Sequence, residues 1–187
     1  MVHKVSLGRM KLTDFRNYAE VALTFDARHV VLTGDNGAGK TNLLEAVSFL
    51  SPGRGLRRTP FEALAQHGSE GAWAVAVTVE SPDGPVDVGT GLTPGDPGRR
   101  VRINGAGTRS IEAMSAYLRV LWLTPAMDGL FTGPAGDRRR FLDSLVTTLV
   151  PGHAAIAADY DKAMRQRNRL IEEDADPDWL TAIEAQM

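Results

Sequence analysis

The spacing of apolar residues divides the first part of the chain into short elements. Apolar and polar side chains alternate over residues 5–7 and 21–25, which predicts two half-buried strands joined by a connector over residues 12–18. Residues 30–32 are all apolar and mostly β-branched, the pattern of a strand buried on both faces. From Thr41 the apolar spacing changes to 3.6 residues, which predicts a helix over residues 41–50 that Pro52 and Gly53 end.

The remainder of the chain changes from strand patterns to helix patterns. Residues 73–79, 86–92 and 101–103 have strand patterns, and Asn104-Gly105 is a hairpin signal. After about residue 110 the pattern becomes helical, which places a break there. The sequence therefore predicts two parts, residues 1–110 and residues 111–187, with helices over residues 111–117, 139–149 and 154–173.

A phosphate-binding motif lies between the expected buried strand and the helix. The residues Gly34, Asp35, Asn36, Gly37, Ala38, Gly39, Lys40 and Thr41 fit the pattern G-x-x-x-x-G-K-[ST]. Its glycines allow a tight turn whose backbone N–H groups point at phosphate oxygens, and the following helix N-terminus adds partial positive charge. In such a loop Lys40 reaches the β- and γ-phosphates and the Thr41 hydroxyl is a ligand of Mg²⁺. The alternative is a glycine-rich turn that happens to end in Lys-Thr.

Composition narrows the classes of function. The 187 residues are 43% hydrophobic and 24% charged, typical of a globular chain, and the absence of cysteine excludes disulfides, thiolate metal sites and a cysteine nucleophile. No apolar run approaches the ~18 residues of a membrane span, and the N-terminus lacks the apolar centre of a secretory signal, so we expect a cytoplasmic protein without membrane contact.

Charge is unevenly distributed along the chain. The net charge is −2, but residues 172–187 hold six of the 23 acidic residues and none of the 21 basic ones. The rest of the chain is therefore basic overall, which permits binding to nucleic acid without requiring it. The aromatic content of 6% argues against a base-stacking platform for single strands.

Several segments resemble those of the RecF family. The motif and its continuation resemble the loop of the ABC-type ATPases that act on chromosomes, the SMC, Rad50 and RecF group, and Phe15-Arg16-Asn17-Tyr18 narrows the resemblance to RecF and its near relatives. The other segments that resemble RecF are residues 101–105, residues 123–143 with Arg138-Arg139-Arg140-Phe141-Leu142-Asp143, and residues 160–168.

This resemblance implies a fold and a function. The expected fold class is α/β: an ABC-type P-loop ATPase lobe with a mixed sheet around the Walker A loop, its first part in residues 1–110, followed by the incomplete start of a helical lobe. It implies a protein of recombinational repair and replication restart that binds ATP and Mg²⁺. Such a protein dimerises around two nucleotides, clamps DNA at single-strand/double-strand junctions, and works with RecR, RecO and RecA.

Two motifs of that family are missing from these 187 residues. They are the apolar strand that ends in an acid pair (Walker B) and the Ser-Gly-Gly-Gln-like signature. We therefore expect the N-terminal portion of a longer protein, with no catalytic residues of its own. The chain is expected to bind ATP weakly, to hydrolyse it hardly at all, and to be less stable than its length suggests.

Clusters of arginine leave alternatives open. Arg138, Arg139 and Arg140 lie at the expected start of a helix, where cations oppose the helix dipole. They contact DNA phosphates in one interpretation and local acids such as Asp137 in the other. Arg54, Arg57 and Arg58 similarly either steer the nucleotide or belong to a flexible basic loop.

A different class of function is also possible. A small P-loop kinase that acts on a metabolite would use the same motif, with Arg138–Arg140 in its lid. The strand-rich and turn-rich region between the motif and these arginines is unlike the short helical insertions of compact kinases.

Overall fold

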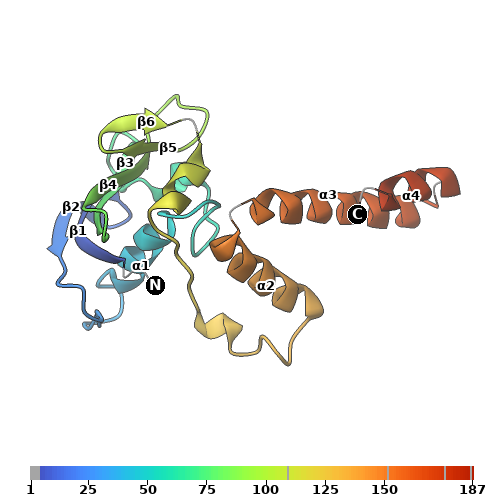
Figure 1. Cartoon of the computed structure of the whole chain (residues 1–187), viewed down its shortest axis with the longest axis horizontal. Helices are drawn as coiled ribbons and strands as arrows, with labels where there is room; N and C mark the ends of the chain where they lie inside the picture. Colours follow the sequence, from blue (N-terminus) through green and yellow to red (C-terminus); the bar gives the residue numbers. More distant parts are fainter. Residues whose placement is uncertain (1–4, 109, 151, 175, 186) are drawn as a thin grey trace. The chain divides into compact units, whose positions relative to one another are not determined.

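A computed structural model describes residues 5–108, 110–150, 152–174, 176–185 and 187 (Figure 1). It divides into two compact units, residues 1–122 and 123–187. The break expected near residue 110 thus falls inside the first unit, because Met114 and Ser115 of the 3₁₀ helix η2 (Ile111–Ala116) are buried there. The assignment of the two parts to an ATPase lobe and a helical lobe stays a prediction.

The first unit is built on a six-stranded sheet in the order β2-β1-β3-β4-β5-β6, and all five pairings are antiparallel. Antiparallel neighbours suit the short hairpin connections of this region. The expected turn at Asn104-Gly105 is confirmed, with positive φ angles of 49° and 79°. The strands are β1 (Ser6–Phe15), β2 (Tyr18–Thr24), β3 (Trp73–Glu80), β4 (Val86–Leu92), β5 (Arg100–Ile103) and β6 (Ala106–Thr108).

Two sequence predictions in this unit are wrong. The connector expected over residues 12–18 is mostly strand, because β1 continues to Phe15 and buries Leu12 and Phe15, which leaves only Arg16 and Asn17 as the turn. No strand forms over residues 30–32, where the side chains of Val30 and Val31 are 55% and 82% exposed. A run of β-branched residues becomes a strand only beside a hydrogen-bonding neighbour, and the described residues offer none here.

One helix and the inner face of the sheet share the hydrophobic core. Helix α1 (Lys40–Ser48) lies beside the sheet (Figure 1). Ala46 of this helix and the two residues that follow it, Phe49 and Leu50, are fully buried in the core. The ring of Phe15 meets those of Phe49 and Trp73 edge-on at centroid distances of 6.1 and 5.6 Å. Such edge-to-face aromatic pairs add stability beyond the burial of their area.

A buried arginine ties the sheet to the end of α1. The guanidinium of Arg99 donates to the carbonyl oxygens of Phe49 (2.5 Å) and Ser51 (2.6 Å) and lies over the rings of Phe49 and Phe61. Burial lowers the pKa of Arg99 to about 10, since desolvation disfavours its charge. The arginine thereby satisfies carbonyls that the helix end leaves unpaired.

In the described part of the second unit, the short 3₁₀ helix η3 (Pro125–Met127) is followed by three helices: α2 (Ala135–Leu149), α3 (His153–Glu172) and α4 (Pro177–Glu184). The ring of His153 contacts the Asp143 carboxylate at 2.9 Å, which joins α2 to α3. Arg167 donates to Glu184 at 2.6 Å and joins α3 to α4. No helix among the described residues is both long and apolar enough to cross a membrane.

Candidate functional site

The phosphate-binding motif forms an open loop that leads directly into α1. Gly34, Gly37 and Gly39 adopt φ angles of 137°, 88° and 101°, values that L side chains rarely reach. Gly39 is the N-cap of α1, and its carbonyl accepts the first backbone bonds of the helix, from Asn42 (2.8 Å) and Leu43 (3.1 Å). Residues 34–38 are exposed, so a ligand can approach the loop from solvent.

The loop side chains are placed for an anion. The ammonium of Lys40 donates to the carbonyl oxygens of Gly34 and Asp35, both at 2.7 Å, and so lies across the mouth of the loop. An ammonium has three donors, so one remains for a ligand. The Thr41 side chain is exposed in the first turn of α1, where backbone N–H groups have no helical partner. This arrangement of amides, helix dipole and ammonium suits a phosphate chain.

The turn between β1 and β2 lies against the loop. A Cβ atom placed on Gly39 would come within 2.5 Å of the Tyr18 hydroxyl oxygen and 2.7 Å of Asn17 Nδ2. The Asn42 side chain donates to Asn17 Oδ1 at 2.8 Å. The loop therefore rests on residues that precede it by about twenty positions, and only glycine fits at the point of contact.

A buried carboxylate lies one helical turn below Thr41. Glu45 is fully buried and accepts hydrogen bonds from Arg16, through Nε (2.9 Å) and Nη2 (2.8 Å), and from Arg57 (2.8 Å). The sequence analysis gave Glu45 no role of its own, and it placed Arg16 in a connector and in a segment that resembles RecF. The available signal was a carboxylate between Leu44 and Ala46 in a helix that packs on the core.

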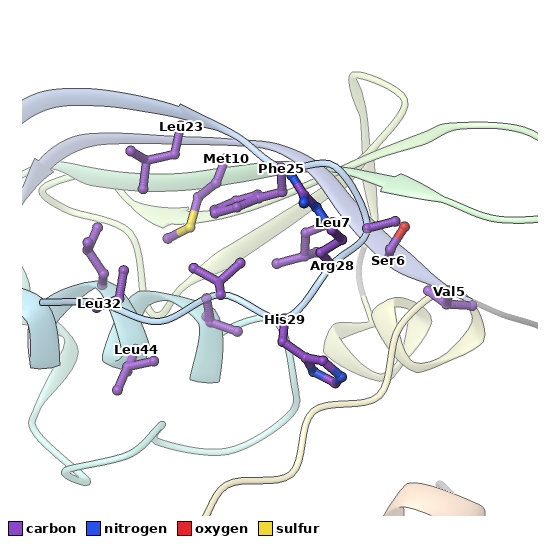
Figure 2. A pocket seen from close by; sticks show the side chains of 14 residues that line it. Val5, Ser6, Leu7, Met10, Leu23, Phe25, Arg28, His29, Leu32 and Leu44 are labelled. Atoms are coloured by element: carbon purple, nitrogen blue, oxygen red, sulfur yellow. The ribbon is translucent and has the colours of Figure 1, made fainter.

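An apolar pocket of the first unit lies beside the phosphate loop in sequence but is lined by none of the loop residues 34–41. Its volume is about 830 Å³, and Figure 2 shows Leu23, Met10 and Phe25 projecting into it from the sheet side, opposite Leu44 of α1. Residues 27–30 and Leu32, which precede the loop, also line this pocket. Because its lining is mainly apolar, this pocket suits side chains of protein rather than a phosphate.

The three arginines expected near the start of a helix do not act together. They do lie in the first turns of α2, as predicted. Arg138 donates to the Gly133 carbonyl at 2.7 Å, and Arg140 pairs with Asp137. Arg139 is exposed and, among the described residues, has neither a hydrogen bond nor an ion pair.

Comparisons with known proteins agree with the resemblance seen in the motifs. The family model described as the RecF/RecN/SMC N terminal domain matches residues 6–85. The DNA replication and repair protein RecF of Rhizobium meliloti is 57% identical over 190 residues, and that of Agrobacterium fabrum is 59% identical over 192. All of this chain is covered in both, but only 51% of each relative, so the chain spans about half the length of these relatives.

Solved structures give the same result for the fold. The structure of "the recombination mediator protein RecF-ATPrS in RecFOR pathway" matches 98% of this chain and 50% of its own, with a TM-score of 0.80 and 22% identity. A second structure, of RecF-ATP in the same pathway, matches with a TM-score of 0.72 and 25% identity over the same shares. The predicted fold class, an α/β P-loop ATPase lobe, is confirmed by these likenesses. Along its whole length the chain is therefore more than half identical to RecF proteins of DNA replication and repair, of which it spans about half.

Proposed function

We propose that this chain binds the triphosphate of ATP, with Mg²⁺, in the loop from Gly34 to Thr41. The observation that carries the proposal is the loop itself: three glycines at positive φ, a free helix N-terminus, and the Lys40 ammonium at the loop mouth. The name of a solved relative includes ATP, which favours this nucleotide. Thr41 would supply the protein's oxygen ligand to Mg²⁺, which neutralises phosphate charge when bound.

Lys40→Ala is expected to weaken ATP binding at least tenfold without unfolding the chain. The Lys40 ammonium would make charge-assisted bonds to phosphate oxygens, each of which contributes about 1.5–3 kcal/mol. Calorimetric titration with ATP and Mg²⁺ at millimolar concentration measures the effect. Lys162→Ala removes an exposed ammonium from α3 and is the matched control, expected to bind as the wild type does. Equal affinity of Lys40→Ala and the wild type would contradict the proposal.

For the whole protein we propose a RecF-like role in recombinational repair and replication restart. ATP would stabilise a dimer around two nucleotides, so that nucleotide state sets the affinity for DNA at single-strand/double-strand junctions. RecR, RecO and RecA are the proposed partners. The family and the basic excess of residues 1–171 support this role. Because the acid pair and signature are absent from these 187 residues, we propose that the chain alone does not hydrolyse ATP.

Among Arg138, Arg139 and Arg140, we propose Arg139 as the residue that contacts DNA, because the other two have local partners. Arg139→Ala should weaken binding to a fluorescent junction DNA and reduce the slope of log affinity against log salt by about 0.9, the value for one phosphate contact. Fluorescence anisotropy from low to moderate salt measures both. Arg28→Ala, at an arginine paired with Asp26, should leave the slope unchanged. A slope that Arg139→Ala does not alter would exclude this contact.

The kinase alternative is not preferred. All the relatives described above are RecF proteins of DNA replication and repair. Transfer of the γ-phosphoryl group from ATP to a small metabolite would favour the kinase and contradict the proposed function.

A further inference from the structure

Glu45 connects three segments of chain that are distant in sequence. Its two carboxylate oxygens accept from Arg16 after β1 and from Arg57 after α1. Arg16 also donates to the Thr59 hydroxyl (2.8 Å) and the Ala63 carbonyl (3.1 Å). We call Glu45, Arg16 and Arg57 the Glu45 cluster.

The Glu45 cluster also reaches the phosphate loop. Arg57 Nη1 donates to Asn42 Oδ1 at 2.8 Å, and Asn42 donates to Asn17, whose side chain meets Gly39. Asn42 directly follows Thr41 in the first turn of α1. A continuous path of hydrogen bonds therefore joins the start of α1 to Arg57 and, through Glu45 and Arg16, to Thr59, both in the segment of residues 54–59.

The hydrogen bonds of this path depend on the negative charge of Glu45. One buried carboxylate neutralises two guanidinium groups, of which Arg16 is mostly buried and Arg57 is partly exposed. Without the carboxylate the two cations would repel each other, and Arg16 would be left as a charge with little access to water. A broken buried ion pair is strongly unfavourable for this reason, so the segments that carry the two arginines would separate.

We propose that Glu45 is a positioning residue that holds the phosphate loop in its binding conformation and couples nucleotide binding to residues 54–59. This inference rests on the proposed binding of ATP. Glu45 does not touch the phosphates. It acts through Arg16 and Asn17 on one side of the loop, and through Arg57 and Asn42 on the other.

Glu45→Gln tests the coupling because glutamine keeps the size of the side chain and one acceptor oxygen but removes the charge. We expect the affinity for ATP with Mg²⁺ to fall about tenfold, within the range of coupling between linked sites. Hydrogen exchange gives a second readout. ATP should slow exchange of the backbone amides of residues 54–59 in the wild type and leave it unchanged in Glu45→Gln.

Two control variants separate positioning from loss of stability. Val77→Ala shortens a buried side chain of β3 outside the Glu45 cluster and should lower the melting temperature while the affinity for ATP stays at the wild-type value. Glu20→Gln makes the same chemical change in an exposed ion pair with Lys11 and should alter neither quantity. All affinities are measured at a temperature at which circular dichroism shows each variant folded.

The outcomes distinguish this inference from the proposed function. If the wild-type chain does not bind ATP, the proposed function is wrong and the coupling falls with it. If the wild type binds ATP and Glu45→Gln binds equally well, or if ATP still protects residues 54–59 in that variant, only the coupling is wrong. An equal loss of affinity in Val77→Ala would also overturn it, since stability alone would then explain the effect.

Discussion

Gly39→Ala is expected to abolish measurable ATP binding and to lower the free energy of unfolding by about 2–5 kcal/mol. Alanine at a φ of 101° costs about 1–2 kcal/mol in backbone strain. Its Cβ would also lie 2.5 Å from the Tyr18 hydroxyl oxygen, and such overpacking typically costs about 1–3 kcal/mol. Relief of the contact must move either the turn after β1 or the loop, and a displaced loop no longer points its amides at one phosphate chain.

Urea denaturation and ATP titration measure the two effects of Gly39→Ala. Gly37→Ala is the matched control for stability, because its φ is also positive (88°) but no atom lies within 4 Å of the added Cβ. Gly37→Ala should therefore lower the free energy of unfolding only by the cost of backbone strain. Adding Tyr18→Phe to Gly39→Ala removes the oxygen in closest contact and should restore part of the stability. Equal stabilities of Gly39→Ala and Gly37→Ala would show that the contact with Tyr18 is unimportant.

Phe15→Ala should lower the free energy of unfolding by about 3–5 kcal/mol, the usual cost of truncating a buried phenylalanine. Phe15 is fully buried, and its ring meets Phe49 after α1 and Trp73 of β3. The truncation would open a cavity where the sheet meets the helix. Because an ordinary domain is stable by only about 5–15 kcal/mol, this one change would remove much of the total.

Urea denaturation followed by tryptophan fluorescence measures the loss. The matched control is Phe131→Ala, the same substitution at a side chain that is 83% exposed, with an expected change below about 0.5 kcal/mol. If Phe15→Ala does not fold, Phe15→Leu leaves a smaller cavity and should show an intermediate loss. If Phe15→Ala lowered the free energy of unfolding by less than about 1 kcal/mol, Phe15 would not be a central residue of the core.

Local patterns predicted much of the fold because their causes are local. The strand β3 follows from its run of apolar and β-branched residues, and β4 follows from alternation. The residues of β5 lead into Asn104-Gly105, which forms a turn because both residues tolerate positive φ. Residues 30–32 show the limit of such reasoning. Their composition suits a buried strand, but a strand also needs a neighbour, and Val31 instead faces solvent.

The candidate site likewise has one part that local sequence predicts and another part that it does not. The loop from Gly34 to Thr41 is contiguous, so spacing alone identifies it. Arg16 and Glu45 are 29 positions apart, and no sequence pattern predicts that their side chains form an ion pair. The three arginines of α2 are adjacent in sequence, yet their surroundings differ. Arg138 bonds to a carbonyl and Arg140 to a carboxylate, whereas Arg139 has no hydrogen bond or ion pair among the described residues.

The sequence by itself determined the glycine-rich loop from Gly34 to Thr41, the hairpin turn and most of the strands, since each depends on residues close together in the chain. Only the tertiary structure decided that the turn at Asn17 and Tyr18 supports Gly39, and that Glu45 joins Arg16 to Arg57. The physical reason is that burial and charge pairing depend on which segments meet in space. A buried carboxylate is stable only when the fold brings its cations to it.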